Sequence, residues 1–243
     1  MEQKRAAEEK PGIKICGITT PEEAVYLNEA GVSYAGFVFF PKSKRNVTYE
    51  QAEKIFSGLD PSIKKVAVFV SPTLAEIQSA EEIGADILQI HGTLAQEIIK
   101  KSRHPIWRAV NIKSGTEFLE KEELFYDNIT GIVVDGAQYG GGKTFDWSVN
   151  GALLSVREQF ADKAFILAGG LNSENVQTGI SIFAPDIVDV SSGVENDNGI
   201  GKNRDKIMEF VRKVKEHEKE SVLWRIWRTV CFRIFDEHIK GTG

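Results

Sequence analysis

The sequence contains few sulfur-containing residues, with two cysteines and two methionines among 243 residues. Cys16 and Cys231 cannot build a disulfide framework, so we expect a reduced, cytoplasmic protein. No run of 18 consecutive apolar residues is present, which excludes an ordinary membrane-spanning helix. The first residues, MEQKRAAEEKPG, are charged and lack an apolar segment. We therefore expect a disordered lead-in over 1–12 and no secretory signal.

An excess of positive charge is also missing. Lys and Arg together number 30 against 35 Asp and Glu, which gives a formal net charge of -5. Binding nucleic acid over a broad surface needs a basic face, so we expect no nucleic-acid partner. A small anionic ligand is compatible with this charge, because local dipoles and one or two cations suffice to hold it.

Short runs rich in Val, Ile and Phe alternate with charged segments of helical pattern along most of the chain. Eight strands are predicted, at 13–18, 34–39, 65–70, 86–91, 106–111, 131–135, 164–169 and 186–191. Apolar strands that are each followed by a helix predict a parallel sheet covered by helices. The count favours an α/β fold, a single (β/α)8 TIM barrel over 13–217. An open doubly wound sheet is the alternative, because periodicity does not show closure.

Capping residues mark the ends of several helices between these strands. The expected start and end residues are Thr20 and Gly31, Thr48 and Gly58, and Ser71 and Gly84, with Asn172 or Ser173 as a further start. A last helix is predicted over 202–217, which completes the eighth strand–helix unit.

An amphipathic tail over 218–243 is left outside the barrel. Arg225 and Arg228 share one face of a helix, and another face is apolar, formed by Leu223, Ile226, Trp227 and Val230. Docking of this helix would bury Trp224 and Trp227. The tail could dock on the barrel or on a second subunit, lie on an anionic membrane surface, or be an artefact without a native role. We expect a monomer or a homodimer.

Active sites of such barrels lie where the strands end, at their C-terminal edge. Cys16 lies near the end of the first predicted strand, and Asp135 ends the sixth. Alone, Cys16 would be a buried core thiol and Asp135 a cap for the following loop. On one rim they form a candidate base and acid for proton transfer.

Small residues lie at the ends of the last two predicted strands and directly after them: Gly169, Gly170, Ser191, Ser192 and Gly193. Such residues let the backbone approach a ligand closely, and barrels frequently bind phosphate with these two loops. The sequence therefore predicts a phosphate site here, with a simple tight turn at Gly169 and Gly170 as the alternative.

Four further positions belong to the same rim. Arg45, in PKSKRN (41–46), can grip a carboxylate with two hydrogen bonds, which a Lys does not match. His91, followed by Gly92, either contacts substrate or forms a hydrogen bond within the rim. Lys14 and Asp189 are expected to form a buried pair, with Lys14 as a catalytic base the alternative.

Several motifs occur together in one order: KICGIT (14–19), GFVFFPKSKR (36–45), LQIHG (88–92), VVDG (133–136), GGGKTFDW (140–147), LAGGLNSENV (167–176) and VDVSSGVE (188–195). With them the sequence resembles the phosphoribosylanthranilate isomerase family of tryptophan biosynthesis, from residue 13 to about 216. The resemblance implies an Amadori rearrangement of N-(5-phosphoribosyl)anthranilate to 1-(2-carboxyphenylamino)-1-deoxyribulose 5-phosphate. It implies no metal and no organic cofactor.

The resemblance also implies a role for each candidate. Asp135 would protonate the ribose ring oxygen, Cys16 would remove the C2 proton, and Arg45 would hold the anthranilate carboxylate. Two rivals remain open. Indole-glycerol-phosphate synthase and the sugar isomerases of histidine biosynthesis bind phosphate after the same strands but need another acid and base. A ligand sensor on this scaffold would predict loss of Cys16, Asp135 or Arg45, and all three are present.

Overall fold

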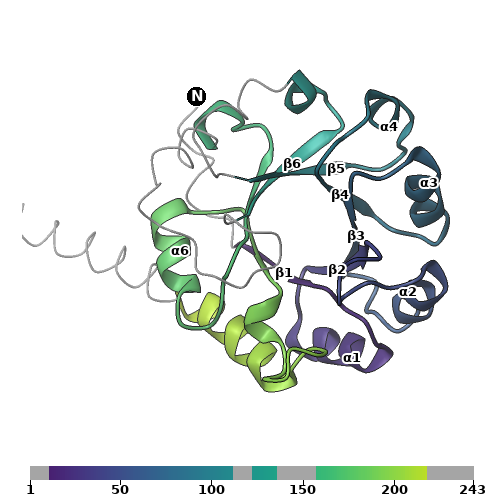
Figure 1. Ribbon diagram of the computed structural model, residues 1–243. Helices are drawn as coiled ribbons and strands as arrows, with labels where there is room; N and C mark the ends of the chain where they lie inside the picture. Colours follow the sequence, from purple (N-terminus) through teal and green to yellow (C-terminus); the bar gives the residue numbers. More distant parts are fainter. Residues whose placement is uncertain (1–10, 112–121, 136–156, 218–243) are drawn as a thin grey trace, which may run out of the picture.

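The computed structural model describes residues 11–111, 122–135 and 157–217, and contains a closed barrel of parallel strands in chain order (Figure 1). The strands are β1 (Gly12–Cys16), β2 (Tyr34–Phe39), β3 (Lys64–Val70), β4 (Ile87–His91), β5 (Ile106–Asn111), β6 (Ile129–Asp135), β7 (Ala164–Leu167) and β8 (Ile187–Val190). β8 pairs with β1 and closes the ring, so the predicted TIM barrel is confirmed and the open sheet is wrong.

Helices form the layer outside the strands (Figure 1). They are α1 (Pro21–Ala30), α2 (Tyr49–Phe56), α3 (Leu74–Glu82), α4 (Gln96–Lys101), α6 (Val176–Phe183) and a last helix over 204–217. Among the described residues, the short 3-10 turns η2 (Glu122–Phe125) and η4 (Ser192–Val194) lie in the connections after β5 and β8.

Both ends of α1 and the start of α2 follow from local chemistry, as predicted, whereas α2 ends at Phe56 with Ser57 as its C-cap, one residue before the predicted Gly58. The Thr20 hydroxyl accepts a hydrogen bond from the Glu23 N–H, and the Glu23 carboxylate accepts one from the Thr20 N–H. This capping box starts α1. Gly31 ends this helix with φ 63°, a left-handed conformation that suits glycine. Thr48 starts α2 in the same way.

Two predicted helix starts are wrong. α3 is capped by Thr73, whose capping box with Glu76 satisfies the first turn, and not by Ser71. Ser71 belongs to the turn after β3, where its N–H donates to the His91 carbonyl. α6 starts at Val176, because Asn172 caps a turn ahead of the helix and accepts hydrogen bonds from the N–H groups of residues 174 and 175.

Apolar side chains fill both faces of the strands. Val68, Trp107, Val133 and Ile166 belong to the cluster inside the barrel, whereas a larger cluster lies between the strands and the helices. Because the interior is packed, a ligand has access only at the ends of the barrel.

Two predicted features lie outside the described residues, the motif 140–147 and the tail 218–243. β1 begins at Gly12, so the predicted lead-in over 1–12 overlaps the barrel by that residue, and residues 1–10 are not among those described. Within the described ranges no helix has the length and apolar character needed to span a membrane.

Candidate active site

Strand closure brings the predicted site residues to one rim. Cys16, His91 and Asp135 are the last residues of β1, β4 and β6. In a closed parallel barrel these ends share one edge. The register pairs Asp135 with Asn111, the last residue of β5. The backbone therefore places the candidate acid and base on different strands around one mouth.

A buried ion pair lies below this mouth. Lys14 and Asp189 are register partners across the β1–β8 junction, and Lys14 Nζ lies 2.7 Å from Asp189 Oδ2. Burial lowers the pKa of Lys14, but the charges of Asp189 and Cys16 outweigh it and the pKa is raised. Burial raises the pKa of Asp189 against the opposing effect of Lys14. This is the buried pair that the sequence led us to expect.

Cys16 is partly exposed and lies next to that pair. Burial raises the pKa of its thiol, whereas the Lys14 ammonium lowers it. The free protein therefore carries Cys16 as a thiol at neutral pH, with Lys14 in place to stabilise the thiolate.

Gly36 on β2 makes the space for both side chains. It is the register partner of Cys16. A Cβ at this position would lie 2.8 Å from Cys16 Sγ and 3.1 Å from Lys14 Nζ, closer than normal contact. The sequence analysis missed Gly36, because only the strand register reveals what faces it.

His91 is held neutral at the end of β4. The amide Nε2 of Gln89 lies 3.0 Å from His91 Nε2, two residues along the same strand. Burial, followed by the charges of Lys14 and Arg108, lowers the pKa of His91 to about 3. Gln89, another residue that the sequence analysis missed, is buried and its Oε1 has no hydrogen-bond partner in the described part of the chain.

Arg45 lies against the loop that follows β8. Its Nε donates to Glu195 Oε1 at 2.5 Å, and a side chain at Gly17 would collide with Arg45 Cδ. Glu195 also pairs with Lys44 and Lys202. Burial raises the pKa of Glu195, but the hydrogen bonds from Arg45 and Lys44 and the charge of Lys202 outweigh it and hold the pKa at about 2. Sequence reasoning assigned no role to Glu195 or Lys202.

The small residues of the last two loops approach each other closely. Gly169 and Gly170 have φ 87° and 69°, and a Cβ at Gly193 would collide with the carbonyl of Leu171. The Ser191 hydroxyl donates to the Cys16 carbonyl at 2.8 Å, which ties the β8 loop to the end of β1. The structure thus brings together Gly169, Gly170, Ser191, Ser192 and Gly193 as predicted for a phosphate site, beside Cys16.

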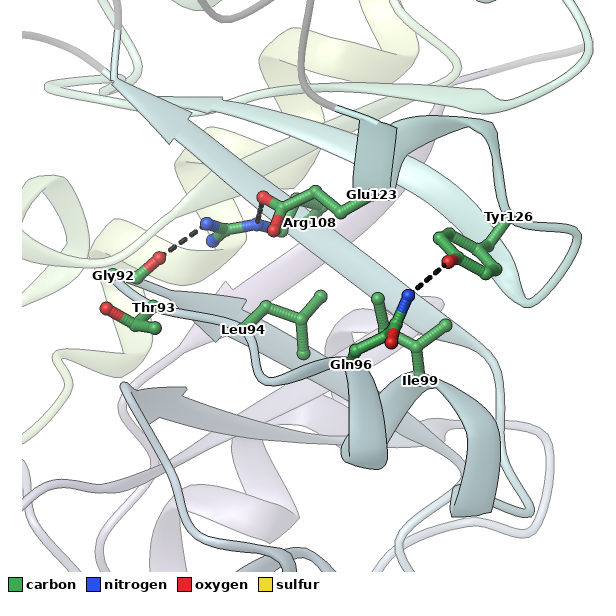
Figure 2. Close-up of a pocket in the computed structure, with 8 residues that line it drawn as sticks. All are labelled: Gly92, Thr93, Leu94, Gln96, Ile99, Arg108, Glu123 and Tyr126. Atoms are coloured by element: carbon green, nitrogen blue, oxygen red, sulfur yellow. Dashed lines mark hydrogen bonds and ion pairs between the residues drawn. The ribbon is translucent and has the colours of Figure 1, made fainter.

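A cavity of about 480 Å³ lies on the outer side of the strands, next to the turn after β4. Figure 2 shows its lining: Gly92, Thr93, Leu94, Gln96, Ile99, Arg108, Glu123 and Tyr126. Arg108 is buried there, pairs with Glu123 at 2.6 Å and donates to the carbonyls of Ile90 and Gly92. Its neighbours Trp107 and Ala109 face the barrel interior, so this cavity is separate from the Cys16 side of the mouth. Arg108 holds the turn that carries His91 and Gly92.

Comparisons with known proteins agree over nearly the whole barrel. The model of the N-(5'phosphoribosyl)anthranilate (PRA) isomerase family matches residues 13–213. An N-(5'-phosphoribosyl)anthranilate isomerase of Streptococcus mutans is 40% identical over 205 residues, covering 84% of this chain and 98% of that protein. A Clostridium kluyveri protein of the same name is also 40% identical, covering 84% of this chain and 97% of that protein.

Solved structures give the same result. The phosphoribosyl anthranilate isomerase of Thermotoga maritima has a TM-score of 0.74 and 38% identity, covering 85% of this chain and 99% of that chain. A phosphoribosyl anthranilate isomerase in complex with reduced 1-(O-carboxyphenylamino)-1-deoxyribulose 5-phosphate has a TM-score of 0.72 and 36% identity, with the same coverage. The chain belongs to the N-(5'-phosphoribosyl)anthranilate isomerase family.

Proposed function

We propose that this chain is an isomerase that converts N-(5-phosphoribosyl)anthranilate to 1-(2-carboxyphenylamino)-1-deoxyribulose 5-phosphate in tryptophan biosynthesis. The observation that carries the proposal is the match of one family model to 13–213, which is nearly the whole barrel. The positions of Cys16 and Asp135, at the ends of β1 and β6 on one rim, support it.

Two proton transfers account for the reaction. Asp135 donates a proton to the ribose ring oxygen, and the nitrogen lone pair forms a C=N bond as the C1–O bond breaks. Cys16 first loses its thiol proton to solvent; the thiolate then takes the proton from C2, and the C–H electrons form a C1=C2 bond while the nitrogen recovers its pair. Loss of the C2 hydroxyl proton and protonation of C1 give the ketone. Each step needs an acid or base at a fixed position.

Lys14 supports this chemistry without being the base. Its ammonium is paired with Asp189 and lies beside Cys16, so its charge stabilises the thiolate that the C2 step requires. The assignment keeps Cys16 as the group that touches the reacting carbon and makes Lys14 a positioning residue.

Two anchors hold the ends of the substrate. Arg45 takes the anthranilate carboxylate, and the Gly-rich loops with Ser191, Ser192 and Gly193 take the phosphate. Gly92 and the neutral His91 border the substrate on the β4 side. This assignment uses no metal ion and no organic cofactor.

The quaternary state and location are part of the same proposal. We propose a cytoplasmic monomer or homodimer, in which the tail over 218–243 docks on the barrel or on a second copy. A related isomerase of Thermotoga maritima is described as dimeric. Sedimentation of the full chain beside a variant lacking 219–243 tests the dimer. An unchanged mass and stability would contradict docking in a dimer.

The activity test follows the loss of anthranilate fluorescence while phosphoribosylanthranilate is generated in situ. Wild type, Cys16→Ala, Asp135→Asn and the control Cys231→Ser are compared. We expect turnover in wild type and the control, and losses of about 100-fold or more in the two site variants, because positioned acids and bases typically contribute that much. Activity surviving in both site variants would keep the reaction and reject the mechanism. A wild type that binds phosphate without turnover would favour a sensor.

A further inference from the structure

We infer that Glu195 is a positioning residue that presents the Arg45 guanidinium to the substrate carboxylate, and that carboxylate selectivity depends on it. The inference rests on the proposed function, in which Arg45 holds the anthranilate carboxylate. It concerns how that guanidinium is aimed rather than which group it binds.

The contact between Glu195 and Arg45 leaves the Nη1 and Nη2 groups of Arg45 available to bind a ligand. Glu195 Oε1 accepts the Nε hydrogen at 2.5 Å, while Nη1 and Nη2 have no hydrogen-bond partner among the described residues. The Arg45 side chain is only 14% exposed. A nearly buried guanidinium with two unpaired terminal groups suits a carboxylate, which binds both at once.

Glu195 itself is fixed from several directions. Lys44 Nζ lies 2.8 Å from Oε2 and Lys202 Nζ lies 3.4 Å from Oε1. The backbone is also held, because Lys206 Nζ donates to the Glu195 carbonyl at 3.0 Å and residue 195 forms a β-bridge with residue 202. The carboxylate is therefore a rigid support for the Nε hydrogen of Arg45.

The stem of Arg45 is also confined. It lies across Gly17, where φ is +80° and any Cβ would collide with Arg45 Cδ. Gly17 directly follows Cys16, so the guanidinium is held one residue beyond the candidate base. A shift of Arg45 would therefore move the substrate carboxylate relative to the group that removes the C2 proton.

Glu195 could act in two other ways. It could organise the phosphate loop, since its partner Lys202 also donates to Ser191 at 3.1 Å. It could also compete with the substrate carboxylate for Arg45. The alternatives predict different effects of a Glu195 substitution on the affinity for ligands with and without a carboxyl group, so the two kinds of ligand are compared.

The test measures dissociation constants by calorimetry for two ligands. One is reduced 1-(O-carboxyphenylamino)-1-deoxyribulose 5-phosphate, and the other is the same compound without the carboxyl group. Glu195→Gln is expected to weaken the first about tenfold, as losing one charged hydrogen bond typically does. The second should change less than about twofold. The double variant Arg45→Ala/Glu195→Gln should bind the first ligand as Arg45→Ala does.

Two further variants keep the result interpretable. Glu195→Asp retains the charge among the lysines but withdraws the carboxylate from Arg45, so it should repeat the selective loss even where Glu195→Gln folds poorly. Glu81→Gln is the matched control. Glu81 lies on α3, is buried and accepts hydrogen bonds from Arg103, and its substitution should leave both constants unchanged.

Three outcomes would overturn the inference. Equally weaker binding of both ligands would mean that Glu195 organises the phosphate loop. Tighter binding of the carboxylated ligand would mean that Glu195 competes with the substrate for Arg45. Additive losses in the double variant would mean that Glu195 does not act through Arg45. Failure of the wild type to bind the carboxylated ligand would contradict the proposed function itself, so the two failures are distinguishable.

Discussion

Gly36 is the residue whose lack of a side chain most directly affects the chemistry of the mouth. We expect Gly36→Ala to lower kcat at least about tenfold, because the new Cβ at 2.8 Å would displace Cys16 Sγ. We also expect a loss of stability of about 1–3 kcal/mol from overpacking. Steady-state kinetics and thermal unfolding measure both effects.

Gly58→Ala is the control for this substitution, because its new Cβ would meet nothing closer than 3.6 Å. Both kinetic constants should then stay at wild-type values. An active Gly36→Ala protein with unchanged kcat would show that the position of Cys16 tolerates this crowding.

His91 is expected to make a clear contribution to the pH dependence of the free energy of unfolding. Its pKa in the folded protein, about 3, lies below the usual value of about 6.5. Between these values the unfolded chain binds more protons at this residue than the folded one. The free energy of unfolding therefore rises with pH through this window, by at most about 1.4 kcal/mol per pH unit from this residue.

His91→Asn should flatten this slope between about pH 4.5 and 6.5, measured by urea unfolding at several pH values. Glu195 also makes the free energy of unfolding rise with pH, but over a lower pH range. Its pKa is about 2 in the folded protein and near 4.3 in the unfolded chain, so it affects stability only below about pH 4.3. An unchanged slope in His91→Asn would mean that the imidazole has the same pKa in the folded and the unfolded protein.

At the level of single residues, type and position in the chain were enough to identify Cys16 and Arg45 as candidates. Gly36 and Glu195 were not identified from the sequence, because their roles depend on which side chains face them in the fold. Gly36 faces Cys16 through the β1–β2 register, and Glu195 meets Arg45 across 150 positions of sequence. No local pattern encodes either contact.

Among the elements, α1 is joined to the site by Glu23. This buried carboxylate caps α1 through the N–H groups of Thr19 and Thr20, and also accepts the Lys202 N–H at 2.6 Å. It thus links the start of α1 to the loop after β8. One side chain therefore supports a helix and one wall of the mouth.

Glu23→Ala should lower the free energy of unfolding by about 3 kcal/mol, because it leaves the buried N–H of Lys202 and the N–H groups of Thr19 and Thr20 without their acceptor. Denaturant unfolding gives the value. The matched control is Glu76→Ala, which removes the same capping partner from the exposed start of α3. Its loss should be clearly smaller, and equal losses would contradict a role for the link to Lys202.

Helix boundaries show where local chemistry suffices. Both caps of α1 and the N-cap of α2 lie in their own turns and were predicted from sequence. The start of α3 was not, since Ser71 and Thr73 both offer a cap. The turn after β3 engages Ser71 with the β4 end, where its hydroxyl accepts the Thr93 N–H, and this tertiary contact decides between them.

For the whole molecule, closure of the barrel places Lys14 and Asp189 side by side in its interior. Removing one partner leaves an unpaired buried charge, so Lys14→Met and Asp189→Leu should each cost about 3–5 kcal/mol. The double variant Lys14→Met/Asp189→Leu should cost less than the two losses added, because neither charge remains.

Urea unfolding of the four proteins completes this cycle. Lys54→Met, which breaks an exposed pair with Glu50 on α2, serves as the surface control and should change stability little. Additive losses in the double variant would mean that the two side chains act independently in stability.

The sequence by itself determined the alternation of strands and helices, the number of strands, and which polar residues stand at strand ends. These are short-range patterns, because burial on both faces and helix capping depend on residues near in the chain. The sequence also led us to expect the pair of Lys14 and Asp189, whereas only the tertiary structure decided that Cys16 meets Gly36 and that Arg45 meets Glu195. Those contacts arise from strand register and from closure of β8 onto β1, which bring together residues that no local periodicity connects.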